Sequence, residues 1–251
     1  MSEVSLLVLQ PSELGPPARL GDWLAAAGAR LDVVRPFAGD RVPADASGWR
    51  GVVCLGGEMD AQDDAGYPWL ADCRALLADA VTRRVPVLAV CLGAQLLAAA
   101  TGGRVGRAEA GPEVGPMLVS RRDAALKDPL LGSLPLSPLV LQFHQDEVAT
   151  LPPGAELLAA SPRCPHQAFR VGSLAWGVQG HVETTPELVL RWRRDAPELA
   201  AHARPGALEP EHLRAEHEQI EETWRPVAER FVELAARPPS VLGEPLPLTS
   251  A

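Results

Sequence analysis

The sequence has little positive charge and almost no lysine. Its 251 residues include 23 Lys or Arg against 32 Asp or Glu, and Lys127 is the single lysine. The formal net charge is −9. Proteins that bind nucleic acid or anionic membranes carry a basic patch, because contacts to phosphates dominate their affinity. The composition therefore excludes a protein that binds nucleic acid or a membrane surface through such a patch.

Long apolar runs and paired cysteines are also missing. No stretch approaches the roughly 18 unbroken apolar residues of a membrane span, and the opening MSEVSLLVLQ lacks the basic start and long apolar core of a signal peptide. The four cysteines are scattered, without a CxxC motif, at positions 54, 73, 91 and 164. In a chain of this length, such cysteines favour free thiols in a reducing compartment. We expect a cytoplasmic protein without a membrane segment.

The first half of the chain alternates apolar strands with amphipathic helices. The helix expected over 67–81 has its apolar side chains at steps of three and four residues. The expected strands are apolar on both sides, which is typical of parallel sheets covered by helices on both faces. The sequence therefore predicts an α/β fold with three layers, in which helices cover both faces of a mostly parallel central sheet. The other elements expected in this half are strands at 4–10, 30–36, 51–57 and 85–90 and a helix at 19–28.

The second half has a different pattern. Short strands and turns fill residues 104–180, and a helix is expected to begin at Thr185, with Pro186 in its first turn. Residues 211–236 repeat apolar positions at steps of three and four, which predicts an amphipathic helix that is kinked at Pro226. We expect it to pack on the same chain, with another subunit as the alternative partner. The predicted organisation is a domain over 1–200, a helical extension over 201–236 and a Pro-rich tail over 237–251.

Cys91 stands where an apolar strand meets a helix, in the stretch VLAVCLGAQLLAAATGG at residues 87–103. A nucleophile on such a turn needs small residues two positions before and after it, and these are Ala89 and Gly93. Unpaired N–H groups at the helix N-terminus favour a thiolate, and the amide of Leu92 can receive an oxyanion. A buried cysteine that only fills space is the alternative.

His181 is the histidine best placed to serve Cys91 as a base. It follows an apolar strand in AWGVQGHVETTPE, so it stands at the carboxyl edge of the sheet, where catalytic groups gather in open α/β folds. Glu183 projects to the same side of an extended chain and can orient the imidazole. The pair Cys164 and His166 lacks further ligands at metal-site spacing, so no metal is predicted. The histidines at 202, 212 and 217 are interpreted as surface or helix-packing residues.

Two further motifs are assigned no ligand. TGGRVGR at 101–107 lacks the GK[ST] ending of a phosphate loop, and it is interpreted as a helix stop and a turn. EMDAQDD at 58–64 lacks the carboxylate spacing of an EF-hand, and it is interpreted as a solvated loop near the mouth of the site. We expect no cofactor.

These segments resemble the class I (triad-type) glutamine amidotransferase family, in particular stand-alone proteins similar to the amidotransferase domain of GMP synthase. The similarity spans residues 4–192 and rests on ordered blocks, with GPEVG and FHQDEV at the expected intervals. The resemblance implies a flavodoxin-like fold with a C-terminal helical extension. The three main blocks are GVVCLGGEMDAQDDAGYPWL (51–70), VPVLAVCLGAQLLAAATGGRV (85–105) and LAWGVQGHVETTPE (174–187).

The resemblance implies a Cys-His-Glu triad and a substrate pocket. Cys91 would be the nucleophile, His181 the base and Glu183 the third member. The amides of Gly57 and Leu92 would form the oxyanion hole, and Gln95 would bind the glutamine substrate. The backbone of 144–146 would hold the amino-acid end of that substrate. The residues concerned are Gly57, Leu92, Gln95, His144, Gln145 and Asp146.

Some positions depart from the family pattern. The family's usual His-Pro-Glu has Val182 in place of proline, which keeps both polar members. Gly180 precedes His181 at a position where the family often has Phe. Gln145 follows His144 where the family usually has Gly, and Ala94 stands where the family commonly has His. These changes leave the triad intact and alter the wall of the pocket.

The resemblance predicts release of ammonia from the glutamine side chain through a γ-glutamyl thioester. The ammonia would pass to a separate synthetase partner, since the chain has no room for a synthetase and no ATP-binding fingerprint. One alternative is a γ-glutamyl peptide or amine hydrolase that acts alone with the same triad. Another is a non-catalytic scaffold that binds a metabolite. The acceptor, the oligomeric state and the role of the C-terminal helix stay open.

Overall fold

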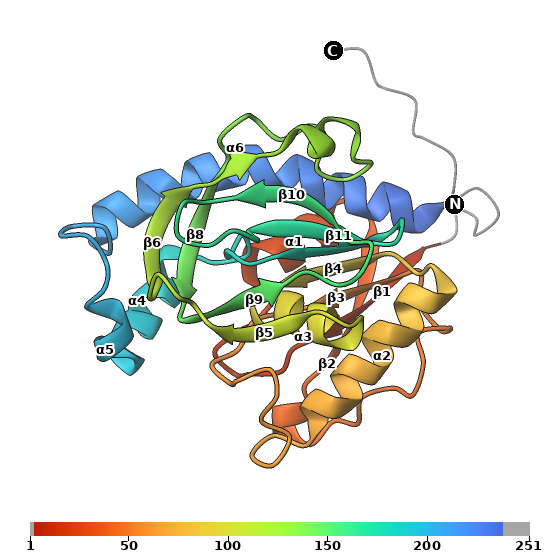
Figure 1. Ribbon diagram of the computed structural model, residues 1–251. Coiled ribbons are helices and arrows are strands. Elements are labelled where there is room, and N and C mark those ends of the chain that lie inside the picture. The colour runs from red at the N-terminus through yellow and green to blue at the C-terminus, as the bar shows by residue number, and fades with distance from the viewer. Residues whose placement is uncertain (1–2, 238–251) are drawn as a thin grey trace.

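The computed structural model describes residues 3–237, in which helices lie on both faces of an eight-stranded sheet (Figure 1). Five neighbouring strands run parallel, and three antiparallel strands extend the sheet at one edge. The order across the sheet is β2 (Ala29–Val34), β1 (Val4–Leu9), β3 (Gly51–Cys54), β4 (Val87–Val90), β12 (Ala175–Val178), β11 (Ala168–Val171), β10 (Glu156–Ala160) and β7 (Ser120–Arg121).

The two faces of the sheet bury two separate apolar clusters. Within β1, Leu6 and Val8 belong to one cluster while Leu7 and Leu9 belong to the other, because successive side chains of a strand point to opposite faces. Helices α1 (Ala18–Ala26), α4 (Pro186–Asp195) and α6 (Pro210–Ala236) contribute to the first cluster. Helices α2 (Trp69–Arg83) and α3 (Leu92–Ala100) contribute to the second. Burial on both faces explains why the strands are apolar throughout.

Two small antiparallel sheets complete the structure beside the main one. They pair β5 (Arg104–Arg107) with β9 (Asp146–Thr150), and β6 (Glu113–Leu118) with β8 (Leu139–His144). An isolated bridge joins β8 to the chain after β12, where the amides of Leu141 and His181 each donate to the other's carbonyl at 3.0 and 2.7 Å. The remaining elements are the short helices α5 (Pro197–Ala200), η1 (Pro36–Ala38) and η2 (Asp123–Lys127).

Helix α6 packs into the same apolar cluster as the central sheet. Its buried face includes Leu213, Ile220, Trp224 and Phe231, and its neighbours are α1, α4, β1 and β8. In Figure 1 it runs behind the sheet along the whole molecule. The helix continues through Pro226. It therefore packs on its own chain, as the apolar periodicity predicts.

The fold class predicted from the sequence is confirmed, and one local expectation is wrong. Helix α3 ends at Ala100 and Gly102 has a φ of 93°, as expected of a helix stop. However, Arg104–Arg107 is a strand rather than a turn, because its backbone pairs with β9. The predicted domain division at 200 stays a prediction, and the Pro-rich tail lies outside the described residues from 238 onward. Among residues 3–237, none of the helices has the length and apolar character needed to cross a membrane.

Gly93→Ala should destabilise the protein, because a Cβ at this position of α3 would lie 2.1 Å from the carbonyl oxygen of Cys54. Overpacking against backbone costs about 3 kcal/mol and outweighs the gain of roughly 1 kcal/mol from replacing a helical glycine. Urea unfolding measures the loss. Gly106→Ala is the matched control, since no atom lies within 4 Å of a Cβ there. Equal stability of the two variants would contradict this account of the packing.

Candidate active site

Cys91 occupies a strained turn between β4 and α3. Its φ of 52° and ψ of −112° lie outside the regions that residues other than glycine normally adopt. Its amide donates to the carbonyl of Val178 at 2.8 Å, and its carbonyl accepts from the amide of Gln95 at 3.1 Å. These bonds hold the turn from both sides. The sulfur-bearing side chain is 5% exposed and lines a cavity of about 700 Å³.

The glycine loop after β3 lies directly against Cys91 and His181. A Cβ on Gly56 would lie 2.9 Å from Cε1 of His181 and 3.5 Å from Cβ of Cys91. A Cβ on Gly57 would lie 2.9 Å from Cδ2 of Leu92. Only glycines let the backbone approach this closely. Gly57 lines the cavity, and Leu92 begins α3, where the first N–H groups have no partner within the helix.

His181 lies beside Glu183 and faces the cavity that Cys91 also lines. Its Nδ1–H donates to Oε1 of Glu183 at 2.6 Å. Glu183 is fully buried, and its Oε2 accepts from the amide of Val182 at 2.9 Å. Burial lowers the pKa of His181, but the negative charges of Glu183 and Cys91 outweigh burial and raise that pKa well above its usual value. His181 and Glu183 are therefore hydrogen-bonded beside the cavity that Cys91 lines, and their roles as a triad stay a prediction.

Gln95 and the segment 144–146 form another part of the cavity wall. The side-chain amide of Gln95 donates to the carbonyl of Asp146 at 3.0 Å, so Gln95 holds the backbone of this segment in place. Asp146 faces the cavity and pairs with Arg107 at 3.3 Å. Burial raises the pKa of Asp146, although the Arg107 charge opposes this shift. Five of the six substrate-binding residues expected from the sequence line the cavity: Gly57, Gln95, His144, Gln145 and Asp146.

A buried polar network lies behind His144. The Nδ1–H of His144 donates to the carbonyl of Asp146 at 2.9 Å, and its Nε2 lies 3.2 Å from Oε2 of Glu113. Glu113 also accepts from Ser161 at 3.0 Å and from Gln167 at 2.7 Å. Burial raises the pKa of Glu113, but these hydrogen bonds outweigh burial and leave it below its usual value. The network therefore holds in place the side of the 144–146 segment that faces away from the cavity.

The same region contains a group of side chains of the type that binds metals. Ligand atoms of Glu113, His144 and Cys164 lie within 4.8 Å of one another, and all three residues are buried. No metal was expected from the sequence, which pairs Cys164 with His166 instead. In the structure the His166 ring bonds to the carbonyl of Val148 at 2.6 Å. Because hydrogen bonds already occupy His144 and both oxygens of Glu113, we interpret the group as part of the polar network.

Gln179 is a site residue that the sequence pattern did not single out. It is buried, and its Nε2 lies 3.8 Å from Sγ of Cys91, within hydrogen-bonding distance for sulfur. Its Oε1 accepts from Gln95 at 3.3 Å. A signal was available, because Gln179, His181 and Glu183 occupy alternate positions and share one side of an extended chain. The same alternation that pairs Glu183 with His181 therefore also points to Gln179.

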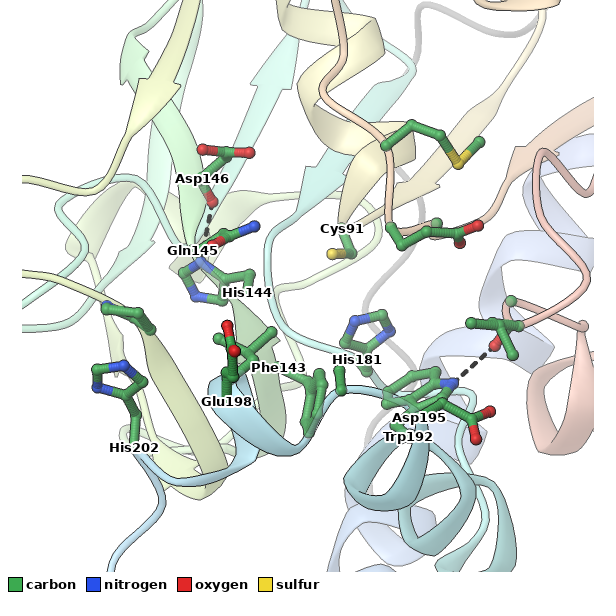
Figure 2. Close-up of a pocket in the computed structure, with 18 of the residues that line it drawn as sticks. Cys91, Phe143, His144, Gln145, Asp146, His181, Trp192, Asp195, Glu198 and His202 are labelled. Atoms are coloured by element: carbon green, nitrogen blue, oxygen red, sulfur yellow. Dashed lines mark hydrogen bonds between the residues drawn. The ribbon is translucent and has the colours of Figure 1, made fainter. Parts of the chain in front are cut away.

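An aromatic wall lies next to His181. The ring centroids of Trp192 and His181 lie 4.7 Å apart, and those of Phe143 and Trp192 lie 5.4 Å apart. The Trp192 indole N–H donates to the carbonyl of Leu14 at 2.8 Å. Both aromatic residues line the cavity (Figure 2). Trp192 is buried, and it also forms part of the surface that a ligand in the cavity can contact.

Comparisons with known proteins agree with this geometry. Residues 20–189 match the family described as glutamine amidotransferase class-I. The chain is 31% identical over 170 residues to the glutamine amidotransferase-like protein YfeJ of Salmonella typhimurium. The aligned region covers 66% of this chain and 70% of that protein. The chain belongs to the class-I glutamine amidotransferase family. This family is one of cysteine-dependent amidotransferases and hydrolases.

Other members of the family differ in the activities that their names state. A glutamine-hydrolyzing GMP synthase subunit of Thermococcus kodakarensis is 40% identical over 113 residues, or 45% of this chain and 58% of that one. Gamma-glutamyl peptidase 3 of Arabidopsis thaliana is 32% identical over 150 residues, or 58% of this chain and 59% of that one. The match thus spans less than two thirds of either relative. The solved glutamine amidotransferase of Methylobacillus flagellatus superposes with a TM-score of 0.80 at 29% identity, covering 92% of this chain and 94% of its own.

Gln179→Leu should slow the alkylation of Cys91 by iodoacetamide, because the substitution removes the side-chain amide that lies within hydrogen-bonding distance of the sulfur. A lost bond of about 1 kcal/mol corresponds to a roughly 5-fold lower rate at fixed pH. Peptide mass analysis measures the rate at Cys91. Gln219→Leu, an exposed site on α6, is the control. An unchanged rate in Gln179→Leu would contradict a role for Gln179 at the sulfur.

The contact between His181 and Glu183 should make the stability of the protein depend on pH. Burial lowers the folded-state pKa of His181, but the charges of Glu183 and Cys91 outweigh burial and raise that pKa above its unfolded value of about 6.5. The protonated ring therefore stabilises the fold fully at pH values below about 6.5, and this benefit is lost as the pH rises through the folded-state pKa. Glu183→Gln should cost about 1.5 to 3 kcal/mol near pH 6 and less near pH 9.5 in urea unfolding. The same cost at both pH values would refute the assignment, and Glu211→Gln is the exposed control.

Proposed function

We propose that the protein is a cysteine hydrolase that cleaves γ-glutamyl amides, of which glutamine is the smallest. The observation that carries this proposal is the hydrogen bond of His181 to Glu183 at the wall of a cavity that Cys91 also lines. A nucleophile, a base and a group that orients the base are the parts that covalent amide hydrolysis requires. Membership of the class-I family supports the same assignment.

The first half of the reaction forms a thioester. The Cys91 thiolate attacks the γ-carbonyl carbon, and the amides of Gly57 and Leu92 receive the resulting oxyanion. His181, kept protonated by its raised pKa, gives its proton to the departing nitrogen as the C–N bond breaks. Ammonia or an amine leaves, and the γ-glutamyl group stays on the sulfur.

The second half returns the enzyme to its starting state. Neutral His181 takes a proton from water, and the resulting hydroxide attacks the thioester carbon. The C–S bond then breaks, glutamate leaves, and Cys91 is again a thiolate beside a protonated His181. Glu183 stabilises the imidazolium in both halves, because its carboxylate is fixed at 2.6 Å from the ring.

Two uses of this chemistry remain, and one observation favours the second. Ammonia could be delivered to a synthetase partner, a use that fits the similarity to a GMP synthase subunit. Alternatively, the protein could act alone on larger γ-glutamyl compounds, a use that fits the similarity to a gamma-glutamyl peptidase. A cavity of about 700 Å³ lies within the range of about 300 to 1,000 Å³ that holds drug-sized ligands. This size favours a γ-glutamyl compound larger than glutamine.

Cys91→Ala should abolish glutamate release from glutamine and from a γ-glutamyl amide, by a factor of at least about 10³, because loss of a covalent nucleophile removes the pathway. A glutamine-like diazoketone should label wild-type protein once, at Cys91, as peptide mass analysis can show. Cys73→Ala is the control, since burial raises the pKa of that thiol to about 12 and keeps it unreactive. Turnover that survives in Cys91→Ala would overturn the proposal.

A further inference from the structure

The residue that follows Glu183 makes a buried polar contact with helix α6. The hydroxyl oxygen of Thr184 lies 3.0 Å from Nε2 of His217, and neither residue is exposed to solvent. His217 comes after residue 189, where the match to the family ends. A side chain from beyond the family match therefore reaches the segment that carries His181 and Glu183.

The surroundings of His217 determine which group donates in this hydrogen bond. Nδ1 of the ring lies 2.7 Å from the carbonyl oxygen of Leu213, and a carbonyl only accepts, so Nδ1 carries the ring hydrogen. Burial and the nearby charge of Arg19 lower the pKa of His217 and outweigh the bond to Leu213 and the nearby carboxylates, which raise it. The ring is therefore neutral, and its Nε2 accepts the hydrogen of the Thr184 hydroxyl.

Arg19 joins the same two segments by a second route. Its Nη1 donates to the carbonyl of His217 at 3.0 Å and to Oε2 of Glu221 at 3.1 Å, so the guanidinium is fixed on α6. Its backbone amide donates to the carbonyl of Glu183 at 2.9 Å. Residue 217 thus holds the backbone around Glu183 twice, through Arg19 and through the Thr184 side chain.

The carboxylate of Glu183 has little freedom to adjust if this backbone moves. Its Oε1 accepts from Nδ1–H of His181 at 2.6 Å, its Oε2 accepts from the amide of Val182 at 2.9 Å, and the residue is fully buried. A shift of the 183–184 backbone therefore changes the position of the carboxylate relative to the imidazole. A charge-assisted hydrogen bond this short weakens when its distance or angle departs from the optimum.

We propose that His217 is a positioning residue for Glu183, because through Thr184 it fixes the carboxylate that orients His181. The expected effect on turnover rests on the proposed function, in which His181 gives its proton to the departing nitrogen. Helix α6 thus contributes to the reaction from a buried position behind the site, without touching the substrate.

Thr184→Val and His217→Leu, alone and together, test the hydrogen bond. Each single variant leaves one buried polar group without a partner, so it should unfold at a lower urea concentration than the wild type. The double variant removes both groups, and it should recover part of that stability because two apolar side chains can pack in place of the bond.

Turnover should not follow stability in these variants. In all three, kcat for glutamate release from glutamine should fall by about 10-fold while KM stays within about 2-fold, since misplaced catalytic groups mainly slow the chemical step. His217→Gln should retain most of the wild-type kcat, because its amide oxygen can accept from Thr184 in place of Nε2. His212→Leu makes the same kind of change at an exposed site of α6, and it should leave kcat and stability as in the wild type.

The proton between His181 and Glu183 reports the geometry without any turnover. A short hydrogen bond from an imidazolium to a carboxylate gives a proton NMR resonance far downfield, which should be present at about pH 6, where the ring is protonated. Loss of the resonance in Glu183→Gln identifies it. Thr184→Val and His217→Leu should move it upfield, whereas His212→Leu should leave it in place.

The outcomes separate this inference from the proposed function. A kcat that recovers together with stability in the double variant, or a resonance that does not move in the folded single variants, overturns the positioning role and leaves the hydrolase assignment standing. Wild-type protein that releases no glutamate from glutamine or from a γ-glutamyl amide overturns the proposed function. The proton resonance then still decides whether His217 positions Glu183.

Discussion

The contact between α3 and the end of β3 is the constraint on which the site depends. Because residue 93 has no side chain, the first turn of α3 can lie directly on the carbonyl of Cys54. The chain then has no room for a gradual turn, and Cys91 is left with a positive φ at the edge of the sheet. A strained conformation of this kind persists only where the surroundings fix it, and here the bonds from Cys91 to Val178 and Gln95 do so. The sulfur is therefore held in place before any substrate arrives.

The partners of Cys91 come from the second half of the chain and are fixed by distant elements. The backbone of His181 pairs with Leu141 of β8, and the carbonyl of Glu183 accepts from the amide of Arg19 at 2.9 Å. Thr184 bonds to the ring of His217 on α6 at 3.0 Å. Burial lowers the pKa of His217, which suits a neutral ring used as a brace. Helix α6 thus contacts the residue next to Glu183, so it packs directly behind the His181 segment.

The cavity combines residues inside the family match with a wall that the match does not cover. The matched residues 20–189 include Cys91, His181 and Glu183, while Asp195 and Glu198 come from the segment that follows. Such a division is common, because a fold and its catalytic groups can be kept while neighbouring segments adapt to different substrates. The names of the relatives, GMP synthase and gamma-glutamyl peptidase, are consistent with such a division.

The sequence by itself determined the layered fold, the elbow at Cys91 and the pairing of His181 with Glu183. Each of these depends on a local rule: apolar strands need cover on both faces, a tight turn needs small neighbours, and alternate residues of a strand share a side. Gln179 was within reach of the last rule. Only the tertiary structure decided that β5 pairs with β9, that Glu113 lies beside His144, and that Trp192 and Glu198 face the cavity. These contacts join segments far apart in the chain, and their distances depend on how whole helices and strands pack, which no local pattern encodes.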